Sequence, residues 1–260
     1  MYNILLKQAD YGGKKMSHKE QKPFIPEQHT FPSKEELREG KILNAAINQN
    51  WRVLEKYMHY GLSPSAHKDG FSLLHFAVVG NHPDKAVMLL NQGALINMQD
   101  KENGCTPLLL AVKKAHAKVI DVLLERGADV NKPTKFGYTP LMIAAELGLM
   151  KITQKLLKQG AKVNVSTNDG VKTPLLSALM KKHISVAKLL LDAGADVFAK
   201  NEFGVSAVDY VQKEGFDKTV LGTRLKAFVL KAAKEQEQQK DTQNQAILLA
   251  KMAQNGGRSE

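Results

Sequence analysis

Histidine and cysteine side chains are the groups in this chain that could carry out metal or nucleophilic chemistry. His75, His82, His116 and His183 suggest a metal site, because imidazole is a common metal ligand. Cys105, the sole cysteine, could act as a nucleophile if His75 or His116 served as its base. The sequence offers no third group to orient such a base, so we predict a mildly exposed and unreactive thiol.

Sequence motifs of common enzyme sites are missing. The patterns G-x-x-x-x-G-K-[ST], H-E-x-x-H and G-x-S-x-G do not occur. One cysteine cannot form an internal disulfide, and this chain alone cannot supply a cysteine-based zinc site or an iron–sulfur cluster. We therefore predict that the protein is not an enzyme and needs neither a cofactor nor a metal.

The elements that position these side chains come from an internal repeat. Similar strings start at Gly70, Gly104, Gly137, Gly170 and Gly204. The Ser or Thr residues of these strings are 34, 33, 34 and 33 positions apart. The first four strings each end in an alanine, and a glycine follows that alanine after 16 residues. A period of this length is typical of a solenoid made of stacked units.

Each unit has the signals of two short helices and a loop. Thr106 stands at a helix N-cap and Pro107 at the first helical position. The segment 118–126 has apolar residues at helical spacing, and Gly127 ends it. Turn-forming residues follow in 131–137. Because such short helices are not stable alone in water, neighbouring units must cover their apolar faces.

These residues resemble the ankyrin repeat. The strings TPLLLA and TPLMIA, followed by GADVN, are similar to its pattern T-P-L-H-x-A, and the resemblance covers about residues 36–232. It implies an all-α ankyrin-repeat solenoid in which each period is a helix, a turn, a helix and a hairpin loop. The central copies, residues 69–200, match best, and the two ends read as divergent caps.

The resemblance also suggests roles for recurring side chains. His82, His116 and His183 share one register, in which ankyrin-like units use histidine to hydrogen-bond the loop between helices. The alternative is a metal site, but one histidine per repeat places the imidazoles about 10 Å apart, too far to share one ion. The asparagines at the end of the loop motif could satisfy backbone groups of the projecting hairpin, or be targets of hydroxylation. These are Asn97, Asn131 and Asn164.

In ankyrin-like stacks the hairpin tips and the exposed side of the first helix line one concave face, which binds partners. In this register the face also includes Cys105 and is otherwise aromatic and basic. The predicted partner-binding residues are Phe71, Val79, Lys113, Lys114, Lys135, Phe136, Tyr138, Glu146, Leu147, Lys172, Met180, Lys181, Glu202 and Phe203.

Composition and charge limit the classes of function that the protein could have. The 260 residues are 43% hydrophobic and 24% charged, as in globular proteins, and the formal net charge is +11. Our leading hypothesis is a non-catalytic protein-binding module, namely an adaptor, a scaffold or a stoichiometric inhibitor, with an acidic or amphipathic partner. The alternative is a protein that binds nucleic acid or another polyanion through its lysines, although arginine is scarce in the repeats.

The domain organisation follows from the period. We expect a flexible or loosely packed segment over 1–34, a repeat domain over 35–232 and a polar, helical or free tail over 233–260. The expected repeats are 36–68, 69–102, 103–135, 136–168, 169–201 and 202–232.

No apolar run is long enough to cross a bilayer or to act as a secretory signal. We expect a cytoplasmic monomer. The richness in Lys, Asn and Gln is also compatible with a bacterial effector delivered into a host cytosol, in which case the tail could be a secretion signal.

Overall fold

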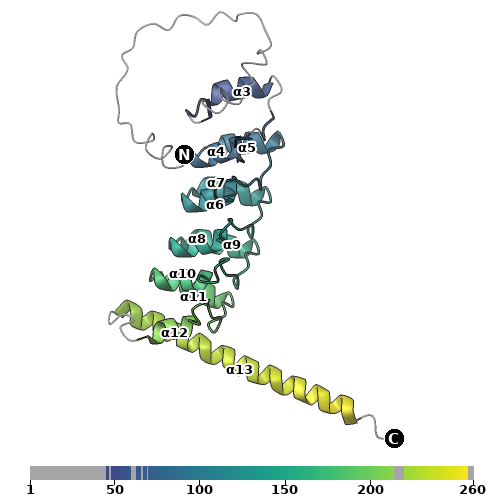
Figure 1. The fold of residues 1–260 in the computed structure, drawn as a ribbon, viewed down its shortest axis with the longest axis vertical. Helices are drawn as coiled ribbons and strands as arrows, with labels where there is room; N and C mark the ends of the chain where they lie inside the picture. Colours follow the sequence, from purple (N-terminus) through teal and green to yellow (C-terminus); the bar gives the residue numbers. More distant parts are fainter. Residues whose placement is uncertain are drawn as a thin grey trace, which may run out of the picture.

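The protein is a stack of helix pairs in a computed structural model that describes residues 45–46, 48–59, 63–65, 67–68, 70–213 and 220–256 (Figure 1). The first helices of the repeats are α4 (Leu73–Val79), α6 (Pro107–Lys113), α8 (Pro140–Glu146), α10 (Pro174–Met180) and α12 (Ala207–Gln212). The second helices are α5 (Pro83–Asn91), α7 (Ala117–Glu125), α9 (Met150–Lys158) and α11 (Ile184–Asp192). Helix α3 (Trp51–His59) precedes them, and the long helix α13 (Val220–Gly256) follows. The predicted all-α solenoid is confirmed.

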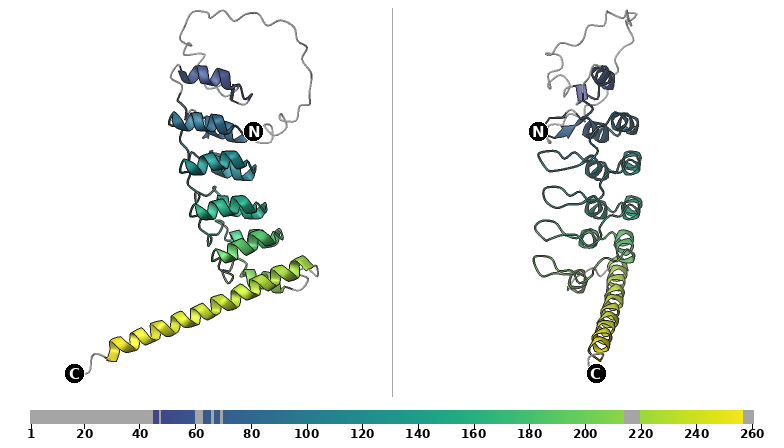
Figure 2. Two further views of the ribbon diagram at one scale, coloured as in Figure 1. Left: turned by 180° about the vertical axis from the view of Figure 1, so that it is seen from behind. Right: turned by 90° about the vertical axis from the view of Figure 1, so that its right-hand side faces the viewer.

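The helices form two columns, and the loops project from one side. Helix α8 contacts α6 and α10, whereas α7 contacts α5, and α9 contacts α11 (Figure 2). The loop before α4 contains a short antiparallel hairpin of β1 (His67–Lys68) and β2 (Phe71–Ser72). Each described repeat therefore touches mainly its two neighbours, as expected for a solenoid.

The predicted capping residues start the first helices. The Thr106 side chain accepts a hydrogen bond from the Leu109 backbone N–H at 3.2 Å, and Pro107 occupies the first turn, where a missing N–H is harmless. Thr139 and Thr173 cap α8 and α10 in the same way. Equivalent caps at equivalent positions give helices of the same length and orientation.

The core lies between the columns and consists of aliphatic side chains. Leu108 and Leu141 are fully buried, and Leu175 is 2% exposed. The predicted register of the first helices is therefore correct. In the second helices Leu156 and Leu190 are fully buried, whereas the neighbouring Leu157 and Leu189 are half-buried.

Asparagine side chains join one repeat to the next. The Asn131 side chain donates to the Gly160 carbonyl at 3.1 Å and accepts from the Lys162 N–H at 2.8 Å. Asn97 likewise accepts from the N–H of Asp129 at 2.9 Å. These amides satisfy backbone groups, as predicted, but the groups belong to the loop that follows the second helix of the next repeat.

Helix α13 takes the place of a second helix behind α12 and contacts both α11 and α12. Val229 and Ala233 are buried in this contact. The predicted division between residues 232 and 233 thus falls within one continuous helix, while the segment 1–34 lies outside the described residues. None of the helices described is long and apolar enough to span a membrane.

Candidate functional site

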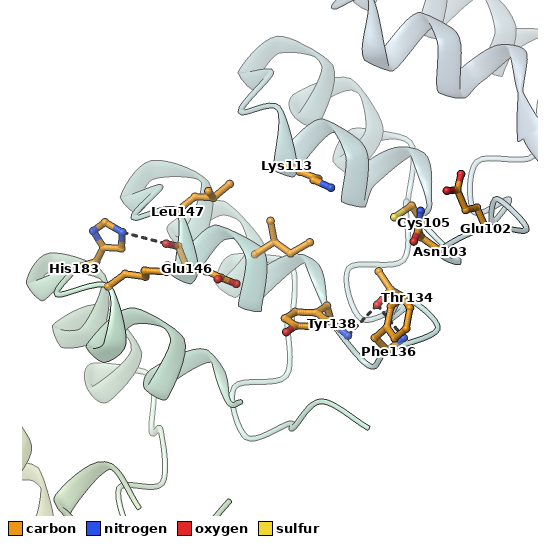
Figure 3. Close-up of a pocket in the computed structure, with 12 residues that line it drawn as sticks. Glu102, Asn103, Cys105, Lys113, Thr134, Phe136, Tyr138, Glu146, Leu147 and His183 are labelled. Atoms are coloured by element: carbon orange, nitrogen blue, oxygen red, sulfur yellow. Dashed lines mark hydrogen bonds between the residues drawn. The ribbon is translucent and has the colours of Figure 1, made fainter. Parts of the chain in front are cut away.

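A groove of about 900 Å³ lies between the projecting loops and the first helices of three successive repeats (Figure 3). Its walls come from α6, α8 and the end of α10, together with the loops that precede α6 and α8. Glu102, Asn103, Cys105, Lys113, Thr134, Phe136, Tyr138, Ile143, Glu146, Leu147, Lys181 and His183 line the groove. The groove therefore lies within the predicted concave face.

The groove brings together six of the fourteen residues predicted to bind a partner. They are Lys113, Phe136, Tyr138, Glu146, Leu147 and Lys181. Phe136 is 58% exposed and Leu147 is 46% exposed, which are high fractions for large apolar side chains. Apolar surface flanked by charged groups is typical of a protein-binding site.

Other predicted residues lie away from the groove lining. Phe71 and Val79 pack against the core beside α4, and the Phe71 ring is 4.8 Å from that of Phe76. Lys114 is half-buried as the C-cap of α6. Exposed positions outside the lining are Lys135, Met180, Glu202 and Phe203.

Two residues of the groove lining, Tyr138 and Glu146, contact Lys172, a predicted partner-binding residue that does not itself line the groove. Lys172 Nζ is 3.3 Å from Glu146 Oε1 and 5.4 Å from the centre of the Tyr138 ring. Burial disfavours the charge of Lys172, but Tyr138 and Glu146 outweigh this effect and raise the pKa of the lysine. Lys172 thus balances the charge of Glu146 and holds the Tyr138 ring, and less of its charge is available to a partner.

A tight turn presents Phe136 and Tyr138 to the groove. The buried Thr134 hydroxyl accepts hydrogen bonds from the N–H groups of Phe136 at 3.3 Å and Tyr138 at 3.1 Å. Gly137 has φ +83°, and a Cβ there would lie 2.5 Å from Asn168 N. Only glycine fits this position, so the backbone fixes the directions of both aromatic side chains.

Cys105 is buried, with 9% of its surface exposed, so the prediction of a mildly exposed thiol was wrong. The Asp100 carboxylate accepts from the Cys105 N–H at 2.8 Å and holds the residue beneath the loop. Burial, followed by the charge of Asp100, raises the pKa of the thiol to about 11. At neutral pH the thiol is protonated and therefore a poor nucleophile.

The recurring histidines hydrogen-bond the preceding unit, where two of them reach carbonyls at the end of the first helix rather than the loop between helices. His116 Nδ1 donates to the Val78 carbonyl at 2.9 Å, and His183 Nε2 donates to the Glu146 carbonyl at 3.1 Å. His82 Nε2 bonds Gln49 Oε1 at 2.9 Å. Over the described part of the chain, no three His, Cys, Asp or Glu side chains are grouped as metal ligands would be.

Sequence reasoning missed five lining residues, Glu102, Asn103, Thr134, Ile143 and His183. Ile143 occupies the helix position of Leu110, which is buried, and its partial exposure depends on the neighbouring repeat. Thr134 carried a usable signal, because Ser and Thr often bond backbone groups in turns.

Comparison with known proteins supports the resemblance. The family described as ankyrin repeats (3 copies) matches residues 42–134 and 131–201. Among curated relatives, ZDHHC13 from Danio rerio, whose name designates a palmitoyltransferase, is 27% identical over 174 residues, which cover 66% of this chain and 22% of that protein. Ankyrin repeat and SOCS box protein 6 from Pongo abelii is 38% identical over 68 residues, or 26% of this chain and 16% of that protein. The ankyrin repeat protein FPV219 of Fowlpox virus is 37% identical over 60 residues, covering 23% and 14% of the two chains.

The matched region spans at most 22% of the length of these relatives. What they share with this chain is therefore the repeat array.

Proposed function

The chain belongs to the ankyrin repeat family, whose arrays are protein–protein interaction modules, and from this premise we propose that it holds its partner in the groove across α6, α8 and α10. The protein then acts as a non-catalytic adaptor, scaffold or stoichiometric inhibitor. The raised pKa of Cys105 agrees with a non-catalytic role, because this thiol lines the groove but stays protonated.

The observation that carries the proposal is the exposure of large apolar side chains in a preformed groove. Phe136 and Leu147 are about half exposed, and the half-buried Tyr138 and Ile143 line the same groove. A partner that covers this surface removes it from water, which favours binding by about 25 cal/mol per Å² of apolar area.

Charge supports an amphipathic partner with acidic groups. Lys113 and Lys181 line the same groove, and the protein as a whole carries a formal charge of +11. We propose that apolar side chains of the partner contact Phe136, Tyr138 and Leu147 while its carboxylates face the two lysines. Complementary charge of this kind accelerates association and sets orientation more than it raises affinity.

The setting we propose is a cytoplasm, either of the cell that makes the protein or of a host cell that receives it. Cys105 is the sole cysteine of the chain and is free, which suits a reducing compartment.

The test is comparative affinity capture followed by binding measurements with the purified partner. Proteins captured by the intact chain should be lost from a variant that carries Phe136→Ala and Leu147→Ala, and the affinity of the purified partner should fall by at least tenfold. Phe203→Ala is the matched control, because Phe203 is 69% exposed at the same hairpin position but does not line the groove. Equal capture by the intact chain and the double variant would contradict the proposal.

A further inference from the structure

The turns that join the two helices of each repeat lie along one edge of the stack. We define the turn edge as residues 113–118, 146–151 and 180–185. The first helices of these repeats lie side by side, because α8 contacts both α6 and α10, so the three turns follow one another in a row. His183 Nε2 of the last turn donates to the Glu146 carbonyl of the turn before it at 3.1 Å (Figure 3). The turn edge is therefore one continuous surface.

Positive charge is concentrated on the turn edge. Its single acid is Glu146, whose carboxylate lies 3.3 Å from Lys172 Nζ and is therefore already balanced. Against this acid the turn edge has six lysines, all of them exposed except the half-buried Lys114: Lys113, Lys114, Lys118, Lys151, Lys181 and Lys182.

The other ends of the same second helices are not basic. They lie at residues 125–129, 158–162 and 192–196, which we call the loop edge, and they carry four acids and three bases. All of these side chains are exposed: Glu125, Arg126, Asp129, Lys158, Lys162, Asp192 and Asp196. An anionic partner is therefore attracted to one edge of these repeats and not to the other.

The turn edge also exposes large apolar side chains. Leu147 is 46% exposed, Met150 is 43% exposed and Met180 is 46% exposed. Leu147 and Met150 belong to the turn between α8 and α9, and Met180 ends α10 in the next repeat. The lysines of 113–118 and 180–185 lie on either side of the α8–α9 turn. Exposed apolar side chains among lysines are typical of surfaces that bind at the interface of an anionic membrane.

We propose that the turn edge docks on an anionic lipid surface. Leu147, Met150 and Met180 then enter the interface, while the lysines contact the anionic headgroups around them. Clusters of about four to eight lysines or arginines are attracted to anionic phospholipids, and buried apolar side chains add the second contribution that membrane binding needs. Docking of this kind is peripheral and reversible, because only side chains enter the interface.

A lipid surface fits the turn edge better than nucleic acid does. Phosphates of nucleic acid pair with lysines but do not cover Leu147, Met150 and Met180. The flexible side chains of methionine adapt to a fluid surface. Figure 1 shows the repeats stacked along one direction, so the turns can meet a flat surface together.

The proposal does not rest on the partner groove. Lys113, Leu147 and Lys181 belong to both surfaces, but the rest of the turn edge offers positions outside the groove lining. The test therefore alters Lys118, Lys151, Met150 and Met180, which leaves the groove intact.

Co-sedimentation of the full chain with lipid vesicles tests the charge. Vesicles of phosphatidylcholine with about 30% phosphatidylserine should bind the chain at least about tenfold more tightly than pure phosphatidylcholine. Lys118→Glu with Lys151→Glu should weaken this binding by at least about tenfold. The matched control is Lys158→Glu with Lys162→Glu, which makes the same change in net charge on the loop edge and should weaken binding by less than about threefold. Equal loss in the two double variants, or equal binding to both kinds of vesicle, would overturn the proposal.

The apolar contribution is tested without a change in charge. Met150→Ser with Met180→Ser should weaken binding to the phosphatidylserine vesicles by at least about fivefold, because less apolar surface leaves water. Binding of a DNA duplex should not respond to this change. Urea denaturation shows whether each variant keeps its fold, and the exposed positions predict that it does. Vesicle binding that the methionine variant leaves unchanged, or binding to the duplex that exceeds binding to the vesicles, would contradict a lipid surface as the partner.

Discussion

Asn164 and Gln236 hydrogen-bond alternate peptide groups of one loop, although they are far apart in the sequence. The Asn164 side chain donates to the Gly194 carbonyl at 3.0 Å and accepts from the Asp196 N–H at 2.9 Å. The Gln236 side chain donates to the Ala195 carbonyl at 2.7 Å and accepts from the Val197 N–H at 3.1 Å. An asparagine joins successive repeats, and a glutamine of α13 closes the last one by the same chemistry.

Gln236→Ala should therefore loosen the attachment of α13. The change leaves the Ala195 carbonyl and the Val197 N–H without their partners, and we expect a loss of about 1 to 2 kcal/mol in the free energy of unfolding. Urea denaturation gives this value, and hydrogen exchange of the Val197 amide should become faster. Gln239→Ala, at an exposed position of the same helix, should change neither quantity measurably.

Leu141→Ala should be strongly destabilising. Leu141 is completely buried in α8, and its truncation leaves a cavity between repeats. The expected loss is about 2 to 5 kcal/mol in the free energy of unfolding, measured by chemical denaturation. Leu147→Ala, in which a 46% exposed leucine is truncated, should lose less than about 1 kcal/mol. A similar loss for both variants would be inconsistent with the helix register described.

Acid should weaken the protein through His75. This imidazole is fully buried, its Nδ1 accepts from the Ser72 N–H at 3.0 Å, and burial lowers its pKa from 6.5 to about 4. Between these two pKa values the unfolded chain binds a proton that the folded chain does not. Stability is therefore lost as the pH falls from about 6.5 to about 4, by up to about 3 kcal/mol.

The measurement for His75 is the free energy of unfolding at a series of pH values. His75→Gln removes the titrating group, so its profile should be flatter over this range even if the variant is less stable throughout. Parallel profiles for the two proteins would show that His75 does not carry the acid sensitivity.

Cys105 should react slowly with thiol reagents in the folded protein. A pKa raised from 9.0 to about 11 lowers the thiolate fraction about 100-fold, and burial hinders access further. Labelling with a chromogenic disulfide at pH 8 should therefore be at least about 100-fold faster in urea than in buffer. Asp100→Asn should accelerate labelling of the folded protein, because it removes a nearby negative charge and weakens the hold on the loop.

Local signals predicted the repeat and its core well, because caps and apolar spacing act within one unit. Thr106 and Pro107 mark a helix start, and Leu108 and Leu141 follow at core positions. The burial of Cys105 depends instead on the next hairpin, since Lys135 of that hairpin packs closely over Gly104.

The residues that line the groove were harder to predict, because their exposure depends on contacts between repeats. Lys172, Glu146 and Tyr138 form one cluster, but they come from adjacent repeats and their pairing depends on how these repeats stack. Phe71 occupies the same hairpin position as Tyr138, which lines the groove, yet Phe71 packs against Phe76, a bulkier side chain than its equivalents Leu110 and Ile143. Sequence spacing identifies the face, whereas contacts between repeats decide which side chains remain available on it.

The amide bonds between repeats also bear on how such an array can change its length in evolution. Asn131 and Asn164 each hydrogen-bond the loop after the second helix of the next repeat, with the same geometry. A duplicated repeat inserted between them would therefore have compatible neighbours on both sides. The loop that Asn164 bonds is also bonded by Gln236 of α13, which contacts α11 and takes the place of the second helix of the last pair. We therefore expect duplicated repeats to be accommodated in the interior of the array and not after α13.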